Sequence, residues 1–307
     1  MGGSGGGTYA VPRNVEGLQE RARQEAQQQS LTAEVNALLA EKLAVVNSRD
    51  VEKVGEYLDE AVAALGDRVE DVTQLLYGGS VAKHTYVDGL SDVDALVLLS
   101  GSPTSDPSDV RDQFAQALRE SLPRSEVAEV RVGSMAVTIT YRDGTEIQLL
   151  PAIRRGDQTV AIPSEDGQEW QSIMPRRFAR ALTRVNQAQG QLVVPTIKLA
   201  KTILASQSEQ AVSGYHVEAL AVAAFRDYEG PRNLRSTVQH LFESAASNVM
   251  RPIRDTTGQS EHLDEALGPA GSSERRRLAA VLRRIGSQLE AATSVERWGD
   301  LLGDSQA

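Results

Sequence analysis

The spacing of apolar residues divides the chain into regions with different periods. Residues 15–66 have apolar positions three and four apart, such as Val35, Leu38 and Leu39, and this spacing predicts helices. After about residue 168 no further strand pattern is expected, and the helical period returns for the rest of the chain. Four helices are predicted there, at residues 175–187, 195–205, 215–228 and 274–292.

Between these helical regions the pattern is that of strands. An apolar run ends at Tyr77, and residues 92–99 begin with two aspartates and continue as an apolar run, which predicts a buried strand. Residues 129–141 alternate between apolar and polar positions, with a slip near Gly133. The remaining elements are an amphipathic helix at 106–122, a hairpin turn at 142–145 and a returning strand at 146–150, which Pro151 ends.

This order predicts an α+β protein with a mixed sheet, helices on one face of the sheet, and a helical lobe after it. Residues 1–10 are rich in glycine and are expected to form a flexible tail. We place the lobe boundary in the polar stretch 162–170. The expected division is therefore a core with N-terminal helices at 11–165 and a helical lobe at 166–307.

Composition narrows the classes of function. The chain has 307 residues and no cysteine, which excludes disulfides, thiolate zinc sites and cysteine nucleophiles, and fits a reducing cytoplasm. We expect a cytoplasmic protein without a membrane partner, because no signal peptide or spanning apolar run is found. The net charge is -10 and aromatic residues make up 4% of the chain. An activating nucleic acid is therefore not indicated.

The strongest chemical signal is a pair of aspartates at the start of the apolar strand. Asp92 and Asp94 point to the same side, because side chains alternate along a strand. Two carboxylates that project together repel each other unless a cation lies between them, and a divalent metal with oxygen ligands fits this position. Upstream, Gly79 and Ser80 form a tight turn whose N–H groups and hydroxyl can hold phosphate oxygens.

Lys83 and Thr85 follow this turn and add a cation and a hydroxyl. Metal-binding acids beside a phosphate-holding turn are the parts that phosphoryl transfer requires. The structural alternative is an ordinary turn followed by solvated loop acids. A bare Asp-x-Asp has little specificity, but the combination with the apolar strands and the Gly-Ser turn favours the functional interpretation.

These motifs resemble the signature of nucleotidyltransferases of the DNA polymerase β-like superfamily. The third strand ends Leu-Leu-Pro-Ala at 149–152, which is similar to the branch of oligoadenylate synthase and cyclic GMP-AMP synthase. That branch includes the bacterial CD-NTases of anti-phage signalling. The segments 198–201, 213–220 and 252–258, together with Trp298, also resemble the helical lobe of bacterial members. The resemblance covers residues 31–304.

The resemblance implies a two-lobed enzyme that joins nucleoside triphosphates, ATP among them, into cyclic or linear oligonucleotides and releases pyrophosphate. It implies that Lys201 meets the triphosphate and that Tyr215 stacks on a base with Ser213 nearby. A solvated helix face for Lys201 and a core position for Tyr215 remain the structural alternatives. Two Mg²⁺ ions, with Mn²⁺ as a substitute, are the implied cofactor. A downstream effector that binds the product is the implied partner.

The sequence departs from the family pattern at the third acid. Relatives often have an acid where this chain has Gln148, which we expect to lie at the nucleotide as a neutral neighbour. Glu146 lies one alternation step away on the same strand face, and we predict that it is the third catalytic and metal-binding acid beside Asp92 and Asp94. The alternative is that Glu146 only flanks the hairpin turn in solvent.

Two rival functions remain, and Gln148 supports the first of them. One is a catalytically silent sensor that binds nucleotides in the same cleft, and the other is transfer of a nucleotide to a protein or RNA. A stripe of arginines at 176, 180 and 184 on one predicted helix is interpreted as a solvated face.

Overall fold

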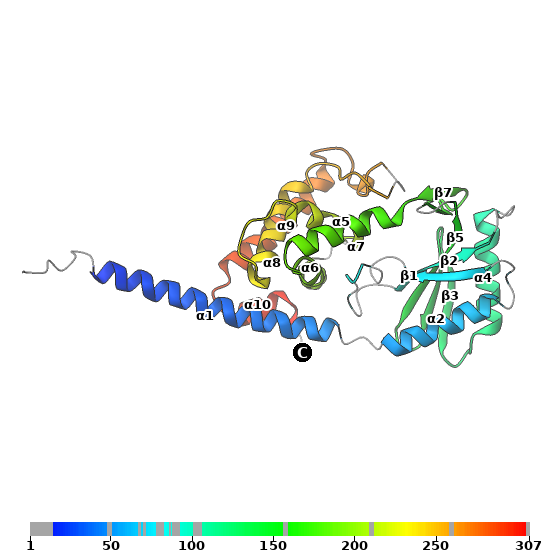
Figure 1. Cartoon of the computed structure of the whole chain (residues 1–307), viewed down its shortest axis with the longest axis horizontal. Coiled ribbons are helices and arrows are strands. Elements are labelled where there is room, and N and C mark those ends of the chain that lie inside the picture. The colour runs from blue at the N-terminus through cyan, green and yellow to red at the C-terminus, as the bar shows by residue number, and fades with distance from the viewer. Residues whose placement is uncertain are drawn as a thin grey trace, which may run out of the picture.

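The computed structural model describes residues 15–47, 51–66, 69, 72–77, 83–85, 87, 93–100, 106–155, 159–208, 212–257 and 261–304. Within these residues the chain forms two lobes, one built on a sheet and one built from helices (Figure 1). The expected tail, the predicted turn at Gly79 and Ser80, and Asp92 all lie outside the described residues.

The sheet has seven strands in the described part of the chain. They are β1 (Val72–Tyr77), β2 (Val93–Leu99), β3 (Val127–Val132), β4 (Val137–Tyr141), β5 (Glu146–Arg154), β6 (Val160–Pro163) and β7 (Trp170–Ile173). The order β1-β2-β5-β4-β3 places β5 beside β2, and β6 and β7 extend from β5. β2 and β5 are parallel whereas the other pairs are antiparallel, so the predicted mixed sheet is confirmed.

One face of this sheet is covered by helices α2 (Val51–Gly66) and α4 (Pro107–Ser121). Phe114 of α4 and Leu58 of α2 are buried there against Ile139 and Ile147 of the sheet. Full burial of a side chain such as Phe114 contributes about 1.5–3 kcal/mol. Figure 1 shows the helical lobe on the other side of the sheet from α4, so the sheet separates α4 from that lobe.

Two expectations about the strands were wrong. Pro151 does not end the third strand, because β5 continues to Arg154. Pro151 lies between Leu149, where pairing with β4 stops, and Ile153, where pairing with β6 starts, and a missing N–H is tolerated at such a position. The second error concerns the stretch 162–170, which was expected to be a polar boundary between the lobes. In the structure it contains the turn of the β6–β7 hairpin.

The helical lobe contains α5 (Pro175–Ala188), α6 (Val193–Gln207), α7 (Gly214–Phe225), α8 (Leu234–Asn248), a short 3-10 helix (Glu265–Leu267), α9 (Ser273–Ala291) and α10 (Val295–Leu301). The four predicted helices correspond to α5, α6, α7 and α9 within two or three residues. α8 and α10 were missed, although each begins at a capping side chain. Asn233 accepts from the Ser236 N–H at 3.0 Å, and Ser294 accepts from the Arg297 N–H.

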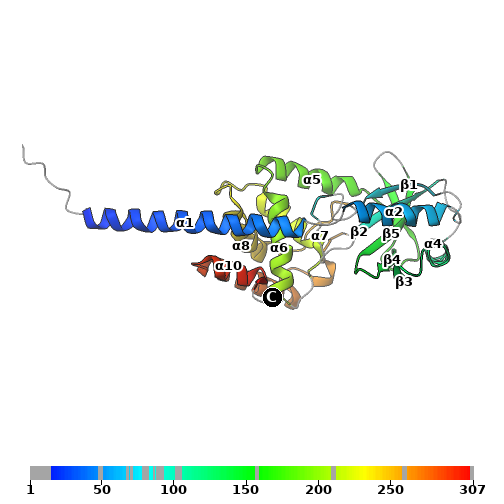
Figure 2. The ribbon, with the colours of Figure 1, turned by 90° about the horizontal axis from the view of Figure 1, so that it is seen from below.

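Helix α1 (Val15–Val46) packs on the helical lobe, although it precedes the sheet in the sequence. Val35 and Leu39 are fully buried in the core of that lobe. The sequence analysis had grouped both N-terminal helices with the sheet. In the structure α1 instead belongs to the helical lobe, although it lies before residue 165 in the sequence. Figures 1 and 2 both show the first half of α1 projecting beyond the rest of the molecule.

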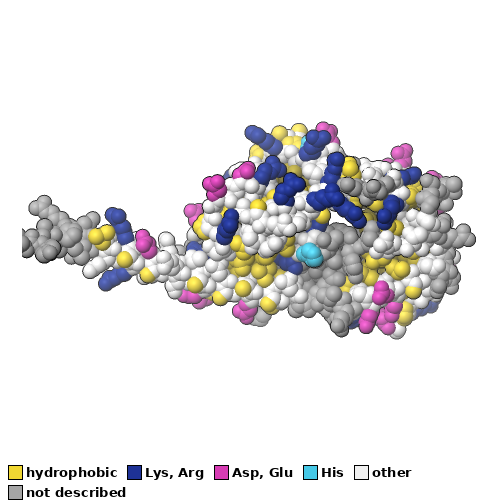
Figure 3. Space-filling view, viewed as in Figure 1, with side chains coloured by type: hydrophobic (Ala, Val, Ile, Leu, Met, Phe, Trp, Pro, Cys, Tyr) yellow, Lys and Arg dark blue, Asp and Glu magenta, His cyan; other side chains and the backbone are white. Residues whose placement is uncertain are grey.

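None of the helices in the described part of the chain is both long enough and apolar enough to cross a lipid bilayer. Figure 3 shows many Lys and Arg side chains on the upper part of one face. Arg176, Arg180 and Arg184 are exposed on α5, which agrees with the solvated face that the sequence predicted.

Candidate functional site

The first part of the candidate site lies where β2 and β5 run side by side. Asp94 of β2 is the register partner of Gln148 of β5. Register partners point to the same face of a sheet, and Glu146 shares that face because it lies two residues before Gln148. All three side chains are half-buried, whereas the neighbouring Ala95 and Ile147 point into the core under α2 and α4. The sheet therefore presents Asp94, Gln148 and Glu146 on the face away from that core.

Glu146 begins β5 directly after the hairpin turn. It pairs with Thr140 of β4, and the Thr140 hydroxyl donates a hydrogen bond of 3.1 Å to its carboxylate. The turn itself is stabilised by Asp143, which accepts from the Thr145 N–H at 2.9 Å, and by Gly144, whose φ of 90° suits glycine. The predicted hairpin is confirmed, and it holds Glu146 on the face that carries Asp94.

The second part of the site is a buried cluster of charges between the two lobes. Glu218 of α7 is 1% exposed and accepts hydrogen bonds from Lys83, Thr85 and Lys201. Lys201 of α6 also donates to the backbone oxygen of Thr85 at 2.9 Å and lies 3.2 Å from the Glu218 carboxylate. Lys83 and Thr85 come from the segment between β1 and β2, so the cluster joins the sheet lobe to α6 and α7.

Lys201 is buried and carries opposing electrostatic influences. Burial lowers its pKa, the adjacent Glu218 carboxylate opposes this shift, and Asp94 raises the pKa further while Lys83 lowers it. The influence of Asp94 ties the two parts of the site together electrostatically. Gly214, at the start of α7, leaves room for this ammonium group, because a Cβ at that position would lie 3.1 Å from Lys201 Nζ.

Tyr215 lies at the edge of the same cluster. The Lys83 ammonium lies 5.0 Å from the centre of its ring and 5.3 Å from the ring of Phe178, at distances typical of cation–π contacts. The Tyr215 hydroxyl donates to Asp255 at 2.8 Å. Burial and this carboxylate raise the pKa of Tyr215. The ring is therefore fixed at its tip by Asp255 and covered by Lys83 on one side.

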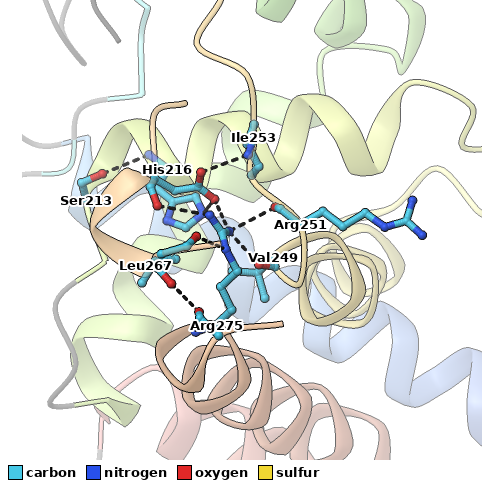
Figure 4. Close-up of polar contacts among 10 residues, drawn as sticks. Ser213, His216, Val249, Arg251, Ile253, Leu267 and Arg275 are labelled. Atoms are coloured by element: carbon cyan, nitrogen blue, oxygen red, sulfur yellow. Dashed lines mark hydrogen bonds and ion pairs between the residues drawn. The ribbon is translucent and has the colours of Figure 1, made fainter. Parts of the chain in front are cut away.

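Ser213 has a defined structural role in this arrangement. It is exposed at the N-cap of α7, and its hydroxyl oxygen accepts from the His216 N–H at 3.2 Å (Figure 4). The His216 ring is buried and lies 3.7 Å from Asp264. Burial is the main cause of its lowered pKa. Asp264 is in turn paired with the buried Arg275 at 2.6 Å. The Ser213 cap thus fixes the first turn of α7, and the His216 ring lies beside the Asp264–Arg275 pair.

The structure brings together most of the predicted site residues that it describes. Asp94, Gln148 and Glu146 share one sheet face, and Lys83, Thr85, Lys201 and Tyr215 meet around Glu218. Thr85 is fully buried, and its hydroxyl donates to Glu218. Sequence reasoning assigned no role to Glu218 or Asp255. A signal for Glu218 exists, because it is an isolated acid among the apolar residues of α7.

A mixed sheet beside a helical lobe, with a cluster of charges between them, is the two-lobed polymerase β-like fold. The family model of the Second Messenger Oligonucleotide or Dinucleotide Synthetase domain (SMODS) matches residues 31–186. The chain belongs to this family, and its fold is that of the CD-NTases.

Solved structures with the same fold cover nearly the whole chain. The CdnC protein of E. coli MS115-1 with ATP superposes with a TM-score of 0.67 at 17% identity, covering 89% of this chain and 98% of that one. The CD-NTase CdnG of Bradyrhizobium diazoefficiens in complex with GTP gives a TM-score of 0.66 at 17% identity, covering 88% and 96%. These identities establish a shared fold.

A curated relative matches a shorter segment. The cyclic AMP-AMP-AMP synthase of Escherichia coli (strain MS 115-1) is 31% identical over 87 residues. This segment is 27% of the present chain and 26% of that protein.

Proposed function

We propose that this protein is a metal-dependent nucleotidyltransferase that joins nucleoside triphosphates, ATP among them, into a cyclic or short linear oligonucleotide. The observation that carries the proposal is geometric: the sheet presents Asp94, Gln148 and Glu146 on the face away from its core, while Lys83 and Lys201 meet at Glu218 between the lobes. Carboxylates on one side and ammonium groups on the other suit a substrate that brings both a metal ion and phosphates. Membership of the synthetase family supports the same reaction.

In this reaction a hydroxyl of one nucleotide attacks the α-phosphorus of another. The new P–O bond forms as the bond to the β-phosphate oxygen breaks, pyrophosphate leaves, and the hydroxyl proton passes to a base. Lys201 and Lys83 are placed to neutralise the charge of the triphosphate. Tyr215 offers an aromatic ring near these lysines, which supports stacking of a base at this end of the site.

The donors on the sheet fit a hard divalent cation. The part of the chain that the structure describes contains no cluster of three His, Cys, Asp or Glu side chains arranged as a metal site, and Asp92 is outside that part. Asp94 and Glu146 nevertheless supply carboxylate oxygens on one face, with the amide of Gln148 opposite Asp94. We propose that Asp92, Asp94 and Glu146 hold magnesium, with manganese as a substitute. The ion would supply positive charge for the nucleotide phosphates and for the developing oxyanion.

The test is incubation of the purified protein with all four triphosphates and magnesium. We expect pyrophosphate release and a new oligonucleotide that resists phosphatase, identified by mass spectrometry. An Asp94→Asn variant, which keeps the size of the side chain, should release none. Turnover only after addition of a protein or RNA acceptor would favour transfer to that acceptor. Tight nucleotide binding without turnover, with either magnesium or manganese, would favour a silent sensor.

We further propose that the product is a second messenger in the cytoplasm, read by a separate effector in anti-phage defence. The family name and the resemblance of the 149–152 and 213–220 segments to bacterial CD-NTases support this role. Cells that carry the protein and its neighbouring genes should lose protection against phage when Asp94 is replaced by Asn. Equal protection by the variant would contradict the proposal.

A further inference from the structure

The Glu218 carboxylate receives donors from three different segments, although it lies in a helix whose other buried side chains are almost all apolar. Lys83 and Thr85 reach it from the sheet lobe, and Lys201 reaches it from α6. At 1% exposure, an isolated carboxylate would be costly to bury, and these donors offset that cost. Glu218 therefore holds the cluster together, because its removal leaves the buried Lys201 and the half-buried Lys83 without the carboxylate that both contact.

We infer that Glu218 is a positioning residue for nucleotide binding: it fixes Lys83, Thr85 and Lys201 in the geometry that receives the triphosphate. This inference rests on the proposed function of the same site. Glu218 itself carries a negative charge and is buried, so it is not expected to touch the phosphates. It acts through the lysines, each of which carries three N–H donors.

Two features of the surroundings support positioning over simple structural filling. Thr85 donates to Glu218 through its hydroxyl and accepts from Lys201 through its backbone oxygen, so Thr85 and Lys201 are fixed by one another and by the same carboxylate. Lys83 is 13% exposed and reaches Glu218 past the rings of Tyr215 and Phe178. Both lysines are thereby held in place at the boundary between the lobes. Without these contacts, such long side chains would sample many rotamers.

A double-mutant cycle tests the inference. ATP binding is measured by calorimetry in EDTA, so that neither metal binding nor turnover affects the result. Glu218→Gln keeps the shape of the side chain and removes its charge, and we expect the Kd for ATP to rise about tenfold. In a Lys83→Gln background the same change should raise Kd by less than about threefold, because one of the groups that Glu218 positions is absent. The matched control, Glu229→Gln on the surface after α7, should leave Kd unchanged.

A purely structural role gives a different pattern. Glu218→Gln would then lower the thermal midpoint and weaken ATP binding equally in both backgrounds, and that result would overturn the inference. Tighter ATP binding by Glu218→Gln would also overturn it, because Glu218 would then be a competitor of the phosphates for the lysines. Glu218→Asp keeps the charge and should recover part of the affinity.

If Glu218→Gln fails to fold, Thr85→Val provides the second arm. It removes one hydrogen bond to the same carboxylate and leaves every charge in place, and we expect Kd to rise about threefold. An unchanged Kd in Thr85→Val would refute the inference. Failure of the proposed reaction can be distinguished from failure of this inference. If the wild-type protein binds ATP but releases no pyrophosphate, the proposed reaction is wrong, and the double-mutant cycle of Kd values still tests the role of Glu218.

Discussion

At the scale of single residues, the site depends on pairs that are distant in the sequence. Asp94 influences Lys201, and Glu218 binds Lys83, yet no sequence pattern links either pair. The sequence could identify Asp94 and Glu146 as acids on strands, because strand alternation is local. It could not identify Glu218 as the centre of the charge cluster, because that role is set by how α7 packs against the sheet lobe.

Asp94 is predicted to be essential for turnover and not for the fold. Asparagine keeps the shape of the side chain but removes the charge that a divalent ion requires, so we expect pyrophosphate release to fall at least about 100-fold. The thermal midpoint should stay the same or rise. The comparison is with Asp112→Asn, at an exposed position on α4. Near wild-type release by Asp94→Asn would remove it from the metal site.

Glu146 and Gln148 are predicted to have different importance. Both lie on the face of Asp94, but only Glu146 offers a carboxylate, which the Thr140 hydroxyl holds at 3.1 Å. Under saturating magnesium, Glu146→Gln should reduce product formation at least about tenfold, while Gln148→Ala should keep a measurable rate. Glu129→Gln on the exposed part of β3 is the control for surface charge. An active Glu146→Gln enzyme would mean that Glu146 only flanks the turn.

At the scale of elements, the segment that connects α8 to α9 is held by a single buried arginine. Arg275 is fully buried and donates to the Asp264 carboxylate at 2.6 Å and to the backbone oxygens of Val249 and Gly268, both at 2.9 Å (Figure 4). Asp264 also accepts from the Ile253 N–H at 2.9 Å. The cluster therefore joins this segment to α9, and Asp264 lies 3.7 Å from the His216 ring at the start of α7.

Replacement of Arg275 should destabilise the helical lobe. Arg275→Met leaves Asp264 as a buried charge without its cation, and we expect a loss of about 3–5 kcal/mol in the free energy of unfolding. Addition of Asp264→Asn should recover part of the loss, because the unpaired charge is then gone. Denaturant unfolding followed by tryptophan fluorescence measures the change, since Trp298 is buried in the same lobe. Arg276→Met on the exposed side of α9 should cost little, and an equal loss there would contradict the role of Arg275.

The pH dependence of stability should show the buried His216. Burial lowers its pKa below the ordinary value of 6.5, so the ring stays neutral in the folded protein when the unfolded chain takes up a proton. Stability is therefore full above about pH 6.5 and decreases as the pH falls from there toward the folded pKa, by at most about 1.4 kcal/mol per pH unit. His216→Asn should flatten the decline between pH 7 and 5, compared with His84→Asn at an exposed position. An identical slope in both variants would exclude His216 as the source.

The two strands that the sequence missed share a physical cause. β6 and β7 are four residues each, which is too short for alternation to be distinct from a polar loop, and they are stabilised by pairing with β5 and with each other. Pro151 is tolerated within β5 because it lies between the last position that pairs with β4 and the first position that pairs with β6. In contrast, helices α5, α6, α7 and α9 and the hairpin at 142–145 were predicted well, because their signals lie within a few residues of chain.

At the scale of the whole molecule, the two lobes are joined by the charge cluster at Glu218 and by a backbone hydrogen bond of 2.8 Å from the Met174 N–H to the Thr257 oxygen. Met174 precedes α5, and Thr257 is close in sequence to Asp255, which holds Tyr215. The two-lobed architecture was predicted from the sequence through its family resemblance. The position of α1 on the helical lobe was not predicted, because an apolar helix face does not specify which core it packs against.

The first half of α1 is predicted to be dispensable for both stability and nucleotide binding. Residues 18–30 are all exposed, and Leu18 is 56% exposed, whereas the contacts with the core of the helical lobe begin at Leu31 and include the buried Val35 and Leu39. Deletion of residues 1–26 should therefore change the free energy of unfolding by less than about 0.5 kcal/mol. The Kd for ATP should be unchanged, since Figures 1 and 2 show this half directed away from the sheet lobe. Deletion of residues 1–40 removes Val35 and Leu39 and should lower the thermal midpoint clearly, because burial of each such side chain contributes about 1.5–3 kcal/mol. If the shorter deletion abolishes product formation while ATP binding and the thermal midpoint are kept, the projecting half of α1 has a role in the reaction that its exposure in the single chain does not reveal.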